Sequence, residues 1–231
     1  MLGWAWPGET LWAQTPHTIA IDGTNDFAAN EDVPGTSGST WYFTWDANNF
    51  YFGITASDVA ANDPNKWVLL YLDTDPRQNP LSGNGTSTGQ QYSNQTPGLP
   101  FFADYHFRWK TNNSFMELQQ WNGSSWVTGN NTGIAAFQSG TFVEFQIPRA
   151  NPGSPAAVYT CGAMINEAAG GEFTFFMTPS SNVQGFDANF THSINRTPST
   201  VMSNHPLRSP TTARSTARSR LGRCRRSHCR A

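Results

Sequence analysis

One segment near the N-terminus restricts the fold of this chain more than any other. Residues 40–55 read TWYFTWDANNFYFGIT, in which large apolar side chains alternate with other residues on both sides of Asp-Ala-Asn-Asn. Asp and Asn favour turns because they tolerate left-handed backbone and bond to nearby peptide groups. A turn at these four residues predicts three cross-strand pairs on one face, namely Trp45 with Phe50, Phe43 with Phe52, and Trp41 with Ile54. We therefore expect a β-hairpin with a core-facing side, which removes Trp41 and Trp45 from the binding candidates.

Similar segments follow at the spacing of a β-sandwich. In FADYHFRWK, residues 102–110, the side chains of Ala103, Tyr105, Phe107 and Trp109 alternate with polar ones, and KWVLLYLDTDP is a nearly continuous apolar run. Only 13% of the residues are charged, and the chain shows almost no helical period. The sequence predicts an all-β fold, a single antiparallel β-sandwich of jelly-roll type with eight to ten strands.

The pattern of charge divides the chain. Residues 1–204 contain sixteen acidic and six basic residues, whereas residues 205–231 contain eight arginines and no acid. We expect a leader remnant or disordered segment at 1–16, the β-sandwich domain at 17–195, and an Arg-rich disordered tail at 196–231. The tail has two other interpretations, a product of out-of-frame translation and a basic arm, and we expect no specific nucleic-acid partner.

The N-terminal residues carry a partial export signal. TLWA followed by Gln14 resembles the end of a secretory signal with cleavage after Ala13, although a basic n-region is missing. The sequence contains no run of about eighteen apolar residues, so we expect no membrane span. We therefore expect a secreted or cell-surface protein.

Motifs for catalysis are missing from the sequence. The chain contains no G-x-S-x-G elbow, P-loop, G-x-G-x-x-G after a strand, or H-E-x-x-H. Glycosidases need two carboxylates flanking one bond, and Glu117 and Glu144 lie on expected strands without any feature that brings them together. We predict that the protein is not an enzyme, with an unrecognised glycoside-active enzyme as the most distant alternative.

Four tryptophans are candidates for carbohydrate binding. An indole ring presents a flat apolar face that stacks on the C–H face of a sugar. Trp121 and Trp126 flank Asn-Gly-Ser-Ser and are expected to oppose each other across a hairpin turn. Trp67 begins an expected strand and Trp109 ends one, which can place either ring at a sheet rim. A hairpin clasp and a core position are the competing interpretations.

One loop is a candidate metal site. LDTDPRQN places Asp73 and Asp75 at a strand end, and hard carboxylate oxygens suit calcium. The following residues, from Asp75 to Pro100, form a long polar stretch rich in Gly, Pro and Ser. Loops of this length in compact domains are usually functional or mobile. Turn-forming aspartates are the alternative to a calcium site.

Four segments taken together resemble a known family. IDGTNDF, TWDANNFYFGI, WVLLYLDTDP and LPFFADYHFRW are similar to type-9 carbohydrate-binding-module-like, or DOMON-like, domains of secreted bacterial proteins. The resemblance covers residues 17–195. It implies an exported, non-catalytic β-sandwich in which two tryptophans hold a terminal sugar and calcium supports loops. Some relatives bind haem through Met and His, but no matching motif surrounds His106, so we expect no haem.

These features together predict a non-catalytic extracellular domain that binds a polysaccharide or cell-surface glycan. Surface tryptophan stacking and polar loop contacts would provide the binding, and we expect a monomer. The main alternative is a structural or adhesive surface domain that binds no sugar.

Overall fold

The computed structural model describes residues 17–197, which form strands and two short 3-10 helices, η1 (Thr36–Gly38) and η2 (Ser57–Ala61). Sheet A has the strand order β1 (Asp32–Pro34), β2 (Thr40–Trp45), β3 (Asn49–Thr55), β11 (Phe142–Pro148) and β10 (Ala135–Ser139). Sheet B has the order β13 (Phe173–Thr178), β12 (Val158–Asn166), β4 (Lys66–Asp73), β7 (Tyr105–Lys110), β8 (Met116–Trp121) and β9 (Trp126–Thr128), and β14 (Ile194–Arg196) pairs with β12. Two further strands, β5 (Thr86–Thr88) and β6 (Gly98–Ala103), form a separate pair.

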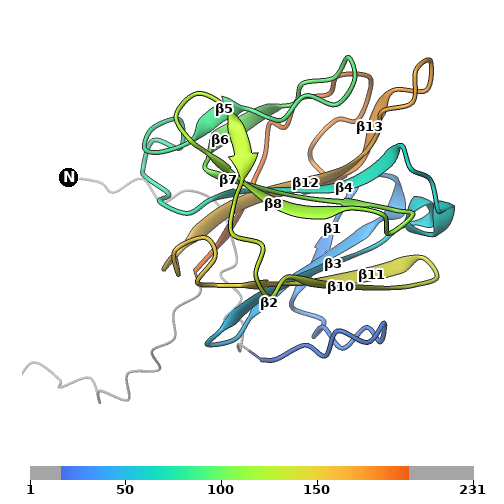
Figure 1. Ribbon diagram of the computed structural model, residues 1–231, viewed down its shortest axis with the longest axis horizontal. Helices are drawn as coiled ribbons and strands as arrows, with labels where there is room; N and C mark the ends of the chain where they lie inside the picture. Colours follow the sequence, from blue (N-terminus) through green and yellow to red (C-terminus); the bar gives the residue numbers. More distant parts are fainter. Residues whose placement is uncertain (1–16, 198–231) are drawn as a thin grey trace, which may run out of the picture. The chain divides into compact units, whose positions relative to one another are not determined.

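The two large sheets lie face to face and form an antiparallel β-sandwich (Figure 1). The all-β prediction is therefore confirmed, while the jelly-roll type stays a prediction. The described residues contain fourteen strands, more than the eight to ten expected. Much of the difference comes from β1, β5 and β14, which have three residues each and are too short to show a period of two.

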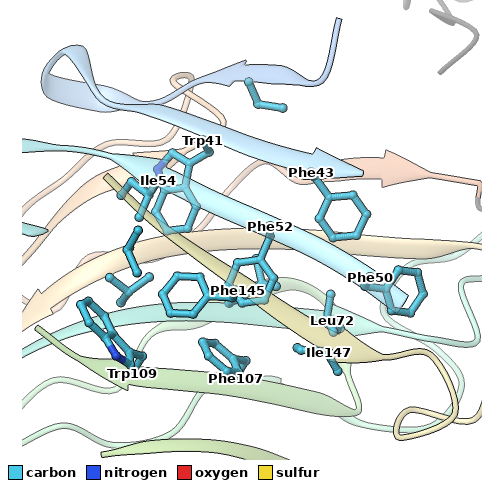
Figure 2. Packing of buried hydrophobic residues seen from close by; sticks show 14 of the residues in the cluster. Trp41, Phe43, Phe50, Phe52, Ile54, Leu72, Phe107, Trp109, Phe145 and Ile147 are labelled. Atoms are coloured by element: carbon cyan, nitrogen blue, oxygen red, sulfur yellow. The ribbon is translucent and has the colours of Figure 1, made fainter. Parts of the chain in front are cut away.

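The predicted hairpin has the predicted register. Trp45 lies opposite Phe50, Phe43 opposite Phe52, and Trp41 opposite Ile54. All six side chains are buried in the core between the sheets. Figure 2 shows the core with Phe52 beside Phe145 of β11 and near Phe107 of β7. The Phe52 ring stacks on Phe145 of sheet A and meets Phe107 of sheet B edge to face. These aromatic contacts tie the two sheets together.

Sheet B is buried on both faces, which explains the continuous apolar run of β4. Val68, Leu70 and Leu72 point into the space between the sheets, whereas Trp67, Leu69 and Tyr71 belong to a second buried cluster on the outer face. Strands that are covered on both sides have no polar face, so their sequence does not alternate.

The long polar segment that was expected to be functional or mobile covers this outer face. It contributes β5, β6 and the buried side chains of Tyr92 and Leu99 to the second cluster. In Figure 1 the β5–β6 pair lies on the side of sheet B away from sheet A. Ala103 packs here too, and not beside Tyr105 as the alternation suggested, because Asp104 separates β6 from β7. The segment is therefore mostly a structural cover.

Several predictions concern other parts of the chain. The N-terminal segment 1–16, including the expected cleavage site after Ala13, and residues 198–231 of the expected tail lie outside the described residues. Within residues 17–197, no helix has the length and apolar character that a membrane crossing requires.

Candidate functional site

The predicted tryptophan hairpin forms at the end of sheet B. Trp121 of β8 pairs with Trp126 of β9, and their rings meet edge to face with centroids 5.6 Å apart. Asn122 stabilises the turn, because its side-chain oxygen accepts hydrogen bonds of 2.9 Å from the backbone N–H groups of Ser124 and Ser125. Gly123 has a φ of 98°, a conformation that favours glycine. The Asn-Gly-Ser-Ser sequence thus builds the tight turn that brings the two indoles together.

The two indoles have different surroundings. Trp126 packs against the outer cluster of sheet B, 6.0 Å from the Tyr71 ring and 5.8 Å from the His106 ring. Its indole N–H donates to the carbonyl oxygen of Thr88, at 3.2 Å, and so links the hairpin to β5. Trp121 is half-buried and borders a groove. Trp126 therefore anchors the hairpin, while Trp121 is the ring that a ligand can reach.

A buried polar cluster around His106 packs against the Trp126 side of the Trp121/Trp126 hairpin. His106 is fully buried; one of its ring nitrogens lies 2.7 Å from the Tyr92 hydroxyl and the other 3.2 Å from the carbonyl oxygen of Leu70. Tyr71 stacks on the imidazole with centroids 4.1 Å apart. Burial lowers the pKa of His106 to about 3. The imidazole is therefore neutral and has a structural role beneath Trp126.

The groove beside Trp121 has a volume of about 810 Å³. Four separate parts of the chain form it: the connection between β4 and β5, the start of β7, the hairpin turn, and the loop after β11. Its walls carry side chains and backbone groups suited to hydrogen bonding beside one indole ring. The main side chains are Thr74, Asn84, Asp104, Gln120, Trp121 and Asn122.

Asp104 provides the carboxylate of the groove. It is 8% exposed and accepts hydrogen bonds from the backbone N–H of Thr74, at 3.0 Å, and from the Thr74 hydroxyl. Burial is the main reason that its pKa rises to about 6, with a further contribution from the negative charge of Asp75. The backbone N–H of Trp121 donates to the carbonyl oxygen of Asp104 at 2.9 Å. This bond places the carboxylate residue next to the aromatic one.

The two predicted calcium ligands lie close to this wall. Asp73 is fully buried; its Oδ1 accepts the backbone N–H of Asp75 at 3.0 Å, while its Oδ2 has no hydrogen-bond partner in the described part of the chain. Burial and the charges of Asp104 and Asp75 raise its pKa to about 7. Asp75 instead accepts from Arg77 at 2.9 Å and from Asn84. Residues 17–197 contain no group of three or more His, Cys, Asp or Glu side chains arranged to hold a metal ion.

Trp67 and Trp109 are not placed at a rim. Trp67 is 6% exposed and lies in the outer cluster of sheet B, with the Lys110 ammonium 4.5 Å from its ring centroid. Trp109 is 1% exposed in the core between the sheets, where its N–H donates to Asn113 at 3.0 Å. A sugar needs an open ring face, so neither residue belongs to the candidate site.

The two glutamates considered for glycoside cleavage are separated by the whole sandwich. Glu117 lies on the outer side of sheet B and binds Arg108 at 2.6 Å. Glu144 lies on the outer side of sheet A and accepts the backbone N–H groups of Asp22, at 2.6 Å, and Gly23, at 2.5 Å. Two carboxylates on opposite outer faces cannot flank one glycosidic bond.

Sequence reasoning missed most of the groove. In the sequence, Asp104 is one of the polar residues that alternate with apolar ones in residues 102–110, and Asn84 lies within the long polar stretch. Their common signal is that each stands at the end of a strand or in a turn beside Gly, where polar side chains point to open space. That signal is shared by many loop residues and does not select these two.

Comparison with known proteins identifies no relative. No protein-family model matches the chain, and neither a curated protein nor a solved structure matches it. The resemblance to type-9 carbohydrate-binding modules and DOMON-like domains therefore stays a prediction. The function has to be argued from the groove and its residues.

Proposed function

We propose that the protein is a secreted, non-catalytic carbohydrate-binding domain and that its ligand occupies the groove beside Trp121. The observation that carries this proposal is the position of a half-buried indole at the border of a groove whose other residues are polar residues, glycines and prolines. Sugars present apolar C–H faces and polar hydroxyl edges. A site for them needs an aromatic platform with hydrogen-bonding groups around it.

The polar residues of the groove provide both donors and acceptors. Asn84, Gln120 and Asn122 have side-chain amides, each of which can donate to and accept from a hydroxyl. Asp104 adds an acceptor at the same wall, and Gly83 and Gly85 leave backbone groups accessible because they carry no side chain. This mixture suits a polyhydroxylated ligand better than an apolar one.

The arrangement favours stacking on one ring. A sugar held between two indoles requires about 7–8 Å between the ring planes, because each contact takes about 3.5–4 Å. The Trp121 and Trp126 centroids are 5.6 Å apart and the planes are inclined by 64°. We therefore assign the platform to Trp121 alone, with Trp126 as its support, in place of the sandwich that the family resemblance implies.

Calcium remains a proposal for the acidic loop behind the groove. The unpartnered Oδ2 of Asp73 is the kind of atom that a cation would satisfy, whereas Asp75 is already paired with Arg77. Thermal unfolding with added Ca²⁺ and with chelator tests this point. An increase in Tm that is specific for Ca²⁺ and lost in Asp73→Asn supports the site, and an unchanged Tm contradicts it.

Affinity electrophoresis against a panel of soluble polysaccharides tests the proposed function. We expect at least one polysaccharide to retard the folded protein, with retardation reversed by the free sugar. The competing interpretation is a structural or adhesive surface domain. A protein that is folded by circular dichroism but is retarded by no polysaccharide, with or without Ca²⁺, would support that alternative.

A further inference from the structure

The described residues that line the groove carry negative charge and no positive charge. Among the described residues that line it, Asp104 is the only one with an acidic side chain, and none is Lys, Arg or His. Arg77 lies on the neighbouring loop, but its guanidinium donates to Asp75. The surroundings of the bound sugar are therefore acidic.

Asp104 has no ion-pair partner among residues 17–197. Its hydrogen-bond donors are the uncharged N–H and hydroxyl of Thr74, and only 8% of the residue is exposed to solvent. A carboxylate that loses water without gaining a cation is destabilised. A ligand that brings a positive charge to this wall would offset that cost, whereas a ligand with a carboxylate or sulfate group would increase it.

Trp121 also favours a positively charged ligand. The hydrogen bond of 2.9 Å from its backbone N–H to the carbonyl oxygen of Asp104 makes the two residues neighbours across adjacent strands, and both border the groove. A sugar stacked on the indole therefore has its edge next to the carboxylate. A cation near the face of an indole also gains electrostatic attraction from the ring. An ammonium group on the sugar ring satisfies both residues at once.

We propose that the groove selects amino sugars with a free amino group, such as glucosamine units, over neutral and acidic sugars. This inference rests on the proposed function, because it assumes that a sugar stacks on Trp121. It identifies Asp104 as the residue that determines specificity, through an ion pair with the ammonium group of the ligand.

Three oligosaccharides of equal length and identical linkage test the inference by isothermal titration calorimetry. A cello-oligosaccharide, an N-acetylglucosamine oligomer and a glucosamine oligomer differ only in the hydroxyl, acetamido or ammonium group at one ring position. We expect the glucosamine oligomer to bind about tenfold more tightly than the cello-oligosaccharide, the size of one charge-assisted hydrogen bond. The advantage should shrink in about 1 M NaCl, where the Debye length is about 3 Å.

Two variants separate the local effect from overall charge. Asp104→Asn keeps a side-chain oxygen for Thr74 and should reduce the advantage of the glucosamine oligomer to about twofold or less. Asp32→Asn removes the same charge from an exposed residue of β1 in sheet A, and should leave the preference unchanged. If Asp104→Asn fails to fold, the comparison of ligands and salt on the unmodified protein still decides the question.

The outcomes distinguish the two proposals. Equal or tighter binding of the cello-oligosaccharide overturns the charge selection and leaves the proposed function intact. Absence of binding to all three oligomers also overturns the charge selection, and the polysaccharide panel then decides the proposed function separately. A preference for the glucosamine oligomer that persists in high salt and in Asp104→Asn contradicts the role of Asp104.

Discussion

The backbone N–H of Trp121 donates a hydrogen bond of 2.9 Å to the carbonyl oxygen of Asp104. This bond joins the last residue of β8 to the residue that precedes β7. It thereby fixes the position of an aromatic side chain relative to a carboxylate at the border of one groove. The β-ladder that builds the sandwich also builds the candidate site.

Replacement of Trp121 by alanine should remove most of the affinity for the polysaccharide and lower the stability of the fold only slightly. The indole provides the stacking platform, so we expect the affinity for a retained polysaccharide to fall about tenfold or more. Loss of the contact with Trp126 should lower the free energy of unfolding by only about 1 kcal/mol. Calorimetric titration and urea unfolding of the same preparation measure both effects.

The matched control for this change is Phe137→Ala. Phe137 is also a surface aromatic residue, 47% exposed, but it lies on β10 at the edge of sheet A. Its removal should leave affinity unchanged. If both variants lose affinity equally, or if Trp121→Ala binds normally, Trp121 is not the platform.

Glu144→Gln should stabilise the protein at neutral pH. Oε1 of Glu144 accepts two backbone hydrogen bonds, but the buried Oε2 has no partner within the described residues. Burial raises the pKa of Glu144 above its ordinary value, and the nearby charges of Asp26 and Asp22 act in the same direction. An amide keeps the accepting oxygen and removes the charge, so we expect a gain of up to about 1 kcal/mol.

The pH dependence of this gain gives a check on its cause. A raised pKa in the folded state means that the native carboxyl stabilises the fold below its unfolded pKa, near 4.5, and loses that contribution as the pH rises. The difference between Glu144→Gln and the unmodified protein should therefore be largest at pH 8 and smallest near pH 4. Urea unfolding at both pH values measures it, and a constant difference would rule out this explanation.

Gly162→Ala should destabilise the sandwich. A Cβ atom at Gly162 of β12 would lie 2.7 Å from the nearest atom of the Trp41 ring, closer than van der Waals contact allows. Trp41 cannot withdraw easily, because it is 3% exposed and its indole N–H donates to the carbonyl oxygen of Phe176 at 2.8 Å. Overpacking of this kind costs about 1–3 kcal/mol.

Gly185→Ala is the control, since a Cβ atom there meets nothing within 4 Å. Equal melting temperatures for the two variants would contradict the packing argument.

The hairpin register could be predicted from the sequence because its signal is local. Strand side chains alternate with a period of two, and a turn of Asp and Asn fixes which residues face each other, so Trp41 and Ile54 could be paired without a structure. The same reasoning placed Trp121 opposite Trp126. Both results depend only on residues close together in the chain.

The groove could not be predicted in this way, and the choice between a rim and a core position for Trp67 could not be made. The groove joins Thr74, Asn84, Asp104 and Trp121, which come from separate segments and meet only when sheet B and its covering loop have formed. For Trp67 the sequence leaves both a rim and a core position open, because nothing local indicates that the long polar loop folds back over sheet B and covers its outer face. Long-range packing decides which strand ends remain open.

The buried imidazole of His106 should make the fold sensitive to acid. Its pKa in the folded protein is about 3, against 6.5 for an ordinary histidine, so the unfolded chain binds a proton that the native protein excludes. The contribution of the neutral imidazole to the free energy of unfolding is therefore fully present above pH 6.5 and is lost as the pH falls towards 3. His106→Gln removes this titration but loses the fitted contacts with Tyr92 and Tyr71, so it should be less stable than the unmodified protein at pH 7.5. We expect the free energy of unfolding, from urea titrations, to drop less between pH 7.5 and 5 in the variant. His192→Gln, at an exposed histidine, should retain the full drop. An identical slope in all three proteins would show that other groups control the acid response.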